Sequence, residues 1–418
     1  MIDRQLKLSD IEAAAKQLKN IAVNTPLQFS ERLSELYGAN IYIKREDLQR
    51  CRSFKVRGAY NKIVSLPTTN DHKKGIVCAS AGNHAQGVAY SCASLKILGT
   101  IFMPLTTPLQ KIDKVKQFGG EYVEIVTIGD TYDDANTKAQ EYSKKHQLTF
   151  VHPFDDYAVM CGQATVAKEI YEELGDKIDM ILIPIGGGGL AAGMSSFLKQ
   201  QKHKMELVGV EPDGAPSMSR SIEHGYVTPL ESIDTFVDGA AVKRVGDATF
   251  AICNENLDET VLVPEGKICT TMIELYQSDG IIVEPAGALS ISALDMIKDK
   301  IKSKTVVCVL SGGNNDILRY PEIMERSLVY NGRKHYFIIE FNQKPGQLRK
   351  FLNEALGPYD DVVRFEYMKK TNRESGAALV GIELYDRHDF NPLLERMEKT
   401  GINFRLLSNK ELLYSYII

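Results

Sequence analysis

The sequence predicts an α/β fold with a mainly parallel, helix-covered sheet, followed by a small α+β module. From about residue 38 to 330, short apolar and β-branched runs alternate with stretches of helical periodicity. Such alternation is typical of strand–helix–strand units whose strands run parallel. The chain has 418 residues, 44% of them hydrophobic and 25% charged. This length and composition suit a globular protein of two or three domains.

The strand candidates are nearly continuous in apolar residues, as expected for strands that are buried on both faces. In chain order they are Ile41–Lys44, Ile76–Ala79, Thr100–Met103, Tyr122–Ile125, Met180–Ile183, Leu207–Val210 and Thr305–Leu310. Helical patterns lie between them, for instance at His84–Ser94 and Asp156–Leu174.

The pattern changes after about Arg333. Strand-like and helical segments then follow in the order βαββαβ, which is the order of a ferredoxin-like module. The segments are Tyr336–Phe341, a helix from Pro345-Gly346 to Leu356, Val362–Met368, Ala377–Leu384, a helix over Phe390–Lys399, and a strand around Ile402–Phe404. The polar stretch Arg326–Lys334, which contains Asn331-Gly332, is the predicted linker.

Composition excludes several classes of partner. A net charge of -4 offers no basic surface for nucleic acid. The apolar runs are too short or too interrupted to span a membrane, and the first ten residues lack the apolar core of a secretory signal. Seven cysteines without a Cys-x-x-Cys pair indicate reduced thiols and a cytoplasmic location.

Lys55, in Ser53-Phe54-Lys55-Val56, follows the strand-like run Ile41–Lys44 and lies at the start of a helical pattern. Backbone dipoles and limited water access at such a place depress the pKa of an amine. A neutral lysine can form a Schiff base with an aldehyde cofactor. Most lysines at helix starts are simply solvated, so this interpretation depends on the segments that follow.

Two strand-to-helix turns are candidate anion sites, because consecutive backbone N–H groups at a helix start can converge on an anion. The first turn suits a carboxylate and consists of Ser80, Ala81, Gly82, Asn83 and His84. An ordinary capped turn is the alternative there. The second turn suits a phosphate and consists of Gly186, Gly187, Gly188 and Gly189. It lacks the Gly-Lys-Ser/Thr of a P-loop and the acidic residue of a dinucleotide site, and a flexible connector is the alternative.

Ser311-Gly312-Gly313-Asn314 follows the last long strand and adds a hydroxyl at the carboxyl ends of the strands, where open α/β sheets bind ligands. By itself it is an ordinary Ser-Gly turn. Together the four segments supply an amine, an anion cradle, a phosphate cradle and a hydroxyl. This set matches the needs of pyridoxal phosphate bound to an amino acid.

With these segments the chain resembles the fold-type II pyridoxal-phosphate enzymes, specifically the threonine dehydratases (threonine deaminases). The resemblance covers essentially the whole length. It is carried by KREDLQRCRSFKVRGAYN, SAGNHAQGVA, PIGGGGLAAG, VEPAGA and LSGGN, in family order. It implies a catalytic region over residues 1–325 with two open, mainly parallel sheets and a smaller subdomain inserted at roughly 53–150. A linker over 326–335 and one ACT-like regulatory domain over 336–418 would follow, as in a short biosynthetic form.

The resemblance also implies roles for single residues. Lys55 would bind the cofactor covalently and act as the base at Cα, with Phe54 beside the pyridine ring and Asn83 bonded to its phenolate oxygen. Gly186 to Gly189 would hold the phosphate, and Ser311 would face the pyridine nitrogen. The loop from Ser80 to His84 would bind the substrate carboxylate, and Glu284 would lie near the cofactor.

The implied reaction is β-elimination of L-threonine to 2-oxobutanoate and ammonia, the first step of isoleucine biosynthesis, with L-serine as a second substrate. Ala81 stands where serine racemases carry a serine that protonates the opposite face of Cα, so elimination should dominate. In those racemases a cation binds acids after a Val-Glu-Pro segment. Here Ser217 stands where an acid would follow Val210-Glu211-Pro212, so no metal is predicted.

Two other functions fit parts of the sequence. One is a β-replacement synthase of the same fold, which needs a second nucleophile and normally lacks a sensor module. The other is a non-catalytic amino-acid sensor, against which the retention of Lys55 with the whole cradle argues. For the C-terminal module we expect binding of isoleucine and valine, with a passive oligomerisation domain as the alternative. The resemblance implies a homotetramer.

Overall fold

The computed structural model describes residues 5–66, 75–368 and 374–408. The chain divides into two compact units. The first comprises Met1–Glu265 and Leu275–Asn315, and the second comprises Gly266–Glu274 and Asp316–Ile418. We describe each unit by itself.

The first unit contains a six-stranded sheet of order β1-β2-β10-β7-β8-β9. All neighbouring strands are parallel except β1 and β2. Ile181, Ile183, Val307 and Val309 alternate along two central strands and face one core, to which α7, α8 and α10 contribute. The strands are β1 (Leu27–Phe29), β2 (Asn40–Arg45), β7 (Met180–Pro184), β8 (Glu206–Pro212), β9 (Glu259–Val263) and β10 (Thr305–Leu310).

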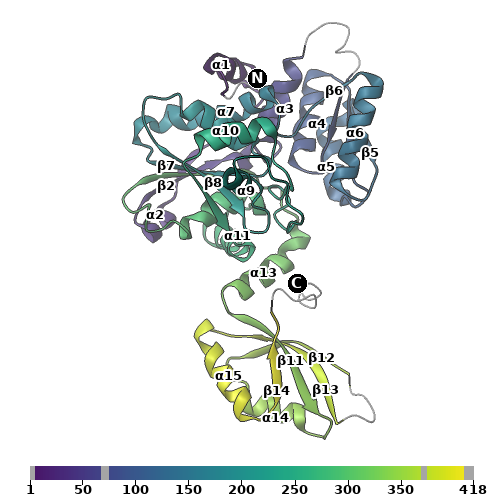
Figure 1. Cartoon of the computed structure of the whole chain (residues 1–418), viewed down its shortest axis with the longest axis vertical. Helices are drawn as coiled ribbons and strands as arrows, with labels where there is room; N and C mark the ends of the chain where they lie inside the picture. The colour runs from purple at the N-terminus through teal and green to yellow at the C-terminus, as the bar shows by residue number, and fades with distance from the viewer. Residues whose placement is uncertain (1–4, 67–74, 369–373, 409–418) are drawn as a thin grey trace. The chain divides into compact units, whose positions relative to one another are not determined.

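A second, wholly parallel sheet of order β5-β4-β3-β6 lies in the same unit. Ile76 and Cys78 of β3 face a core with α4 and α5, whereas Val77 and Ala79 face a core with α6. Figure 1 shows these three helices grouped around the sheet. The elements are β3 (Ile76–Ala79), α4 (Asn83–Leu95), β4 (Gly99–Met103), α5 (Leu109–Gly119), β5 (Val123–Thr127), α6 (Tyr132–His146) and β6 (Thr149–Phe150).

The first unit contains further helices, of which α3 contributes Ala59 and Ile63 to the core of the smaller sheet, while Gly266–Glu274 of α11 belong to the second unit. These helices are α1 (Leu8–Leu18), α2 (Glu31–Tyr37), α3 (Lys55–Val64), α7 (Tyr157–Leu174), α8 (Gly189–Leu198), α9 (Ser217–His224), α10 (Asp247–Asn256), α11 (Glu265–Asp279) and α12 (Pro285–Ser292). Short 3₁₀ turns occur at η1 (Glu46–Leu48), η3 (Gly120–Tyr122), η4 (Gly175–Lys177) and η5 (Ala293–Asp295). The predicted α/β class with two mainly parallel, helix-covered sheets is confirmed.

The second unit contains an antiparallel sheet of order β12-β13-β11-β14, which is the ferredoxin-like order predicted from the sequence. Alternating residues Phe337, Ile339 and Phe341 of β11 pack with Phe351 of α14 and Leu393 of α15, so both helices cover one face. The elements are η6 (Ile317–Arg319), α13 (Tyr320–Tyr330), β11 (Lys334–Asn342), α14 (Gln347–Glu354), β12 (Asp361–Tyr367), β13 (Ser375–Glu383), η7 (Arg387–Asp389), α15 (Phe390–Lys399) and β14 (Asn403–Leu406).

The segment predicted as a linker, 326–335, is mostly regular structure. Its first residues form the last turns of α13 and its last two begin β11, which leaves 331–333 as a turn with Gly332 at φ 67°. The helix continues because Ser327 is buried and its Oγ lies 2.9 Å from Oγ1 of Thr270. The domain limits given by the sequence stay a prediction.

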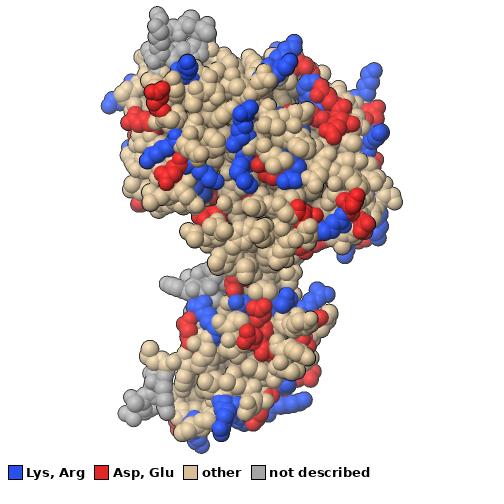
Figure 2. Space-filling model, turned by 180° about the vertical axis from the view of Figure 1, so that it is seen from behind, with Lys and Arg blue, Asp and Glu red and all other residues tan. Residues whose placement is uncertain are grey.

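Acidic and basic side chains are interspersed on the face of the molecule that Figure 2 shows. Among the described residues, no helix combines the length and apolar character that a membrane crossing needs.

Close helix packing in the first unit depends on glycines. A Cβ added at Gly162 of α7 would lie 2.5 Å from the carbonyl oxygen of Arg57 and 2.7 Å from Cα of Gly58. These distances are shorter than any van der Waals contact, so α3 and α7 approach each other as closely as their backbones allow.

We expect Gly162→Ala to destabilise the protein by about 1–3 kcal/mol, because the added methyl group forces α3 away from α7. Helix propensity alone would favour alanine by about 1 kcal/mol, so a net loss identifies the helix contact. Urea unfolding monitored by circular dichroism measures the change. Ser94→Ala, at an exposed position of α4, is the control, and a stabilised Gly162→Ala protein would contradict the prediction.

Candidate active site

The segments singled out in the sequence follow the carboxyl ends of parallel strands. Residues 80–82 follow β3, 185–188 follow β7, and 311–314 follow β10. Within one parallel sheet these ends share one edge, where the crossover helices begin. The two sheets therefore each present one edge of strand-to-helix turns.

Lys55 is the first residue of α3, and the residues before it are paired with the turn after β10. The backbone N–H of Phe54 donates to the carbonyl oxygen of Ser311 at 3.1 Å, and Ser53 forms a β-bridge with Gly312. The amine Nζ of Lys55 donates to the carbonyl oxygen of Pro153 at 2.8 Å and lies 5.3 Å from the centroid of the Phe54 ring. Lys55, Phe54 and Ser311 are thus brought together as predicted.

Burial lowers the pKa of Lys55 to about 8, although the nearby Glu284 carboxylate acts in the opposite direction. Loss of hydration disfavours the charged amine more than the attraction of one carboxylate restores it. A minor but appreciable fraction of Lys55 is therefore neutral near physiological pH. This is the state in which an amine is nucleophilic and can accept a proton.

Asn83 and Glu284 form the second part of the site. Nδ2 of Asn83 donates to Oε1 of Glu284 at 2.6 Å, and Oδ1 of Asn83 accepts from Nδ2 of Asn314 at 2.8 Å. The backbone N–H of Asn314 donates to Oε2 of Glu284 at 3.2 Å. These bonds join the start of α4, beside the smaller sheet, to the turn after β10 of the larger sheet.

Burial raises the pKa of Glu284 to about 7, and the charge of Asp238 adds to the rise. The hydrogen bonds from Asn83 and Asn314 and the charge of Lys111 oppose it but do not outweigh burial. A Cβ added at Gly312 would lie 2.2 Å from Oε1 of Glu284, so the turn after β10 packs directly against this carboxyl group.

The four glycines between β7 and α8 have the properties of an anion cradle. Gly188 has φ 92°, and a Cβ at Gly187 would lie 2.3 Å from the Phe154 ring, so side chains are excluded on this side. Within the described residues, the backbone N–H groups of Gly186, Gly187 and Gly188 donate to no protein acceptor. Open N–H groups at the start of a helix fit a phosphate group.

Ser311 is buried, and its Oγ donates to the carbonyl oxygen of Ala286 at 3.3 Å. In the loop from Ser80 to His84, the backbone N–H of Gly82 donates to Oγ of Ser80 at 3.2 Å. His84 faces another direction, because its Nε2 lies 3.0 Å from the carbonyl oxygen of Val151. Burial lowers the pKa of His84 to about 3, which keeps the ring neutral. This residue can offer only its backbone to a ligand of the loop.

The structure adds a segment that the sequence analysis missed, His152–Asp155. Nδ1 of His152 accepts from the backbone N–H of Asp155 at 2.8 Å, which fixes the turn. Pro153 provides the carbonyl oxygen for Lys55, and the Phe154 ring packs on Gly187. The Asp155 carboxylate accepts from three backbone N–H groups at the start of α10. His152-Pro153 directly after a short strand was the available signal.

Glu211, which belongs to the Val-Glu-Pro segment, is fully buried and bonded within the protein. Its carboxylate accepts from the backbone N–H groups of Met218 and Ser219 and from Oγ of Ser219, all within 2.8 Å. Burial raises its pKa to about 7. Ser217 donates its hydroxyl to the carbonyl oxygen of Val242. Glu211 therefore caps α9 in this structure.

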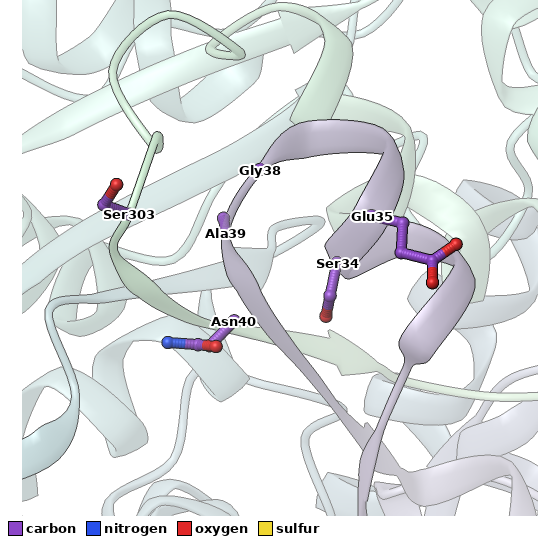
Figure 3. Close-up of a pocket in the computed structure, with 6 residues that line it drawn as sticks. All are labelled: Ser34, Glu35, Gly38, Ala39, Asn40 and Ser303. Carbon is purple, nitrogen blue, oxygen red and sulfur yellow. The ribbon is translucent and has the colours of Figure 1, made fainter.

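A surface pocket of the first unit lies away from these residues. It is a dish beside the turn between α2 and β2, lined by Ser34, Glu35, Gly38, Ala39, Asn40 and Ser303 (Figure 3). None of its lining residues belongs to the predicted site, and Glu35 supplies its one charged side chain.

Comparison with known proteins agrees with this geometry. Residues 18–312 match the family described as pyridoxal-phosphate dependent enzyme, and residues 325–417 match the C-terminal regulatory domain of threonine dehydratase. The fold and the site thus define a pyridoxal-phosphate dependent enzyme with a regulatory domain. The cradle of open N–H groups and the buried lysine fit that cofactor.

Full-length relatives narrow the class. The chain is 52% identical to the biosynthetic L-threonine dehydratase IlvA of Halalkalibacterium halodurans, over 99% of this chain and 100% of that protein. It is 49% identical to the IlvA of Bacillus subtilis, over 99% and 98%. The structure of processed threonine deaminase isoform 2 from Solanum lycopersicum superposes with a TM-score of 0.73 at 42% identity, over 77% of this chain and 92% of that one. The chain belongs to the biosynthetic L-threonine dehydratase family.

The raised pKa of Glu284 gives a pH-dependent stability. Because the folded state binds this proton more tightly than the unfolded state does, protonation of Glu284 stabilises the fold. This contribution to the free energy of unfolding is complete below the ordinary pKa of 4.5 and is lost as pH rises through about 7. Relative to wild type, Glu284→Gln should gain stability between pH 5 and pH 8, by up to about 3 kcal/mol. Chemical unfolding at both pH values tests this. Glu121→Gln, at an exposed position, is the control, and a pH-independent difference for Glu284→Gln would refute the prediction.

Proposed function

We propose that this enzyme eliminates water from L-threonine and releases 2-oxobutanoate and ammonia, with L-serine converted to pyruvate as a secondary reaction. The observation that carries the proposal is the buried amine of Lys55, whose pKa of about 8 leaves it partly neutral beside the Asn83–Glu284 pair. The match to biosynthetic L-threonine dehydratases over the whole chain supports the choice of substrate.

Several residues would hold pyridoxal phosphate. The N–H groups of Gly186 to Gly189 would bind its phosphate, Phe54 would pack beside its ring, and Ser311 would face its ring nitrogen. Lys55 would attach it covalently, and Asn83 would donate to its phenolate oxygen. When bound, the cofactor withdraws electrons from Cα of the attached amino acid and so acidifies the Cα–H bond.

The chain's own groups then do the following work. Within the loop of residues 80–84, the backbone N–H groups of Ala81, Asn83 and His84 bind the substrate carboxylate at the start of α4, where the helix dipole favours an anion. Lys55, once neutral, takes the proton from Cα. Glu284 holds Asn83 in place through the 2.6 Å bond. Ala81 has no proton to return on the opposite face, which favours elimination over racemisation.

Ser311 would limit how strongly the ring of the bound cofactor can withdraw electrons. A neutral hydroxyl cannot stabilise a full positive charge on a ring nitrogen as a carboxylate would. Ser311 would therefore suit a reaction in which the β-hydroxyl leaves promptly once Lys55 has taken the Cα proton.

We further propose that the second unit binds isoleucine, and also valine, as feedback effectors. It contains a cavity of about 140 Å³ lined by Phe341, Asn342, Gln343, Lys344, Gly346, Gln347, Leu348, Phe365 and Tyr367. The side-chain amide atoms of Gln343 are buried and bond to no described residue. Such a cavity suits a branched-chain amino acid, because its apolar side chains can contact the aliphatic side chain of the ligand. The Gln343 amide can then hydrogen-bond to the charged amino and carboxylate groups.

The assembly and location follow from the same assignment. Effector binding can inhibit only if two conformational states of the enzyme differ in effector affinity, and a homotetramer with two quaternary arrangements provides such states.

All seven cysteines are free and buried, which supports a reducing, cytoplasmic location.

Replacement of Lys55 tests the catalytic assignment. Lys55→Ala should lower kcat by about 10³-fold or more, because the covalent anchor and the base are both lost. It should also abolish the visible absorbance that the protein acquires with pyridoxal phosphate. Lys62→Ala, on the same helix, should keep both. The wild-type protein must form 2-oxobutanoate and ammonia from threonine without added thiol or sulfide. If it needed such a nucleophile, it would be a β-replacement synthase. If it turned over no threonine at all, it would be a non-catalytic sensor.

Substitution in the cavity tests the regulatory assignment. Leu348→Ala should raise the isoleucine concentration for half-maximal effect by about tenfold, since removal of a buried apolar contact costs about 1–2 kcal/mol of binding. Leu352→Ala is the matched control, because this residue is similarly exposed on the same helix but does not line the cavity. Equal responses of the two variants to isoleucine would refute this location of the effector.

A further inference from the structure

A cluster of buried charges lies behind α3. Arg57, two residues after Lys55, is 1% exposed and donates to two carboxylates. Its Nε and Nη2 each lie 2.8 Å from an oxygen of Glu46, and its Nη1 and Nη2 lie 2.6 and 2.8 Å from the oxygens of Glu169. Two fork-shaped pairs on one guanidinium fix both its position and its orientation.

The cluster makes three further hydrogen bonds to neighbouring segments. Nη1 of Arg57 donates to Oγ1 of Thr165 at 3.1 Å, and Nη2 donates to the carbonyl oxygen of Val23 at 3.2 Å. Oγ1 of Thr25 donates to Oε1 of Glu46 at 2.6 Å. The cluster therefore connects α3 to α7, to η1 and to the segment before β1.

Lys44 makes the cluster electrically neutral. Its side chain is fully buried, its Nζ lies 2.6 Å from Oε2 of Glu169, and it donates to the carbonyl oxygen of Thr25 at 2.7 Å. Two cations thus face two carboxylates. Buried charges are tolerated when they are paired and hydrogen-bonded in this way.

The pKa shifts agree with this pairing. Burial alone would raise the pKa of Glu46, but the charge and hydrogen bonds of Arg57 outweigh burial and lower it. Burial likewise opposes the charge of Arg57, and the two glutamates outweigh it and raise the pKa. Both groups stay ionised throughout the pH range in which Lys55 titrates.

The cluster does not face the reacting groups. Side chains two residues apart on a helix point to different sides, so Arg57 points away from the side of α3 that carries the Lys55 amine. The charged or titratable groups that act on Lys55 are instead Glu284, His84 and His152. Any influence of Arg57 on Lys55 must therefore pass through the backbone of the first turn of α3.

We propose that Arg57, clamped by Glu46 and Glu169, is a positioning residue that fixes the first turn of α3 and thereby holds the Lys55 amine at the Pro153 carbonyl. The pairing of residues 53–54 with the turn after β10 fixes the chain before Lys55, and the charge cluster fixes the chain after it. The two attachments together fix the backbone on both sides of Lys55, from which its side chain extends to the Pro153 carbonyl. The role assumes that Lys55 is the reactive lysine of the proposed function.

The test is the pH dependence of Lys55 acylation in the full-length protein freed of cofactor, followed by peptide mass spectrometry. Arg57→Lys keeps the positive charge but cannot form two forks. If the first turn loosens, Lys55 becomes more hydrated, and the midpoint of its labelling should rise by about one pH unit toward that of an ordinary lysine. Because labelling needs no substrate, the result is independent of which amino acid the enzyme consumes.

Arg32→Lys is the matched control. Arg32 also forms a fork with a carboxylate, that of Asp279, in the same unit, and the pair lies on other elements than α3. Its replacement should leave the Lys55 midpoint unchanged. An unchanged midpoint in a folded Arg57→Lys protein, or an equal shift in Arg32→Lys, would overturn the proposal.

A milder variant covers the case in which Arg57→Lys does not fold. Thr165→Val keeps all four charges and removes one partner of Arg57. This variant should shift the midpoint of Lys55 labelling in the same direction by a smaller amount. A cooperative unfolding transition would show that the variant is folded. A folded Thr165→Val protein with the wild-type midpoint would likewise overturn the proposal.

Discussion

The position of α3 is the constraint on which the site depends. This helix is held on three sides: by the pairing of Ser53 and Phe54 with the turn after β10, by contact with α7 at Gly162, and by the buried forks of Arg57. The first residue of such a helix has a defined backbone position before any ligand binds, and for the lysine that we propose as reactive, pre-organisation of this kind lowers the cost of reaching the reactive geometry.

Burial explains the electrostatics of the site. Lys55 and Glu284 are both driven toward their neutral forms, with pKa values of about 8 and about 7. Their titration ranges therefore adjoin near neutral pH, where a small change in the surroundings moves a proton on or off either group. A more hydrated site would leave a permanently charged amine and a permanently charged carboxylate, neither of which exchanges protons readily at pH 7.

Most of the framework was predictable because it depends on local patterns. The runs Ile76–Ala79 and Thr305–Leu310 are strands as predicted, and the glycines at 186–189 lie between a strand and a helix. His152–Asp155 was missed because it contributes a backbone carbonyl and a ring packed on glycine, for which the sequence offers only the weak signal of His152-Pro153 after a short strand. Arg57 looks like an ordinary charged residue in the sequence, and only its burial between Glu46 and Glu169 shows otherwise. The first residues of the predicted linker instead belong to α13, which extends to Tyr330 and in which Ser327 is buried.

The sequence by itself determined the class of fold and the order of the elements, and it supplied the candidate reactive groups, because periodicity and residue chemistry are local properties. It also placed Asn83, Gly186 to Gly189 and Ser311 in turns that follow strands, whereas Lys55 begins α3 well after β2 ends at Arg45. Only the tertiary structure decided that Asn83 bonds to Glu284, that His84 turns away to Val151, and that Arg57 lies between two carboxylates. These outcomes depend on which distant segments exclude water together, and a hydrogen-bond partner or a pKa shift exists only once that packing is formed.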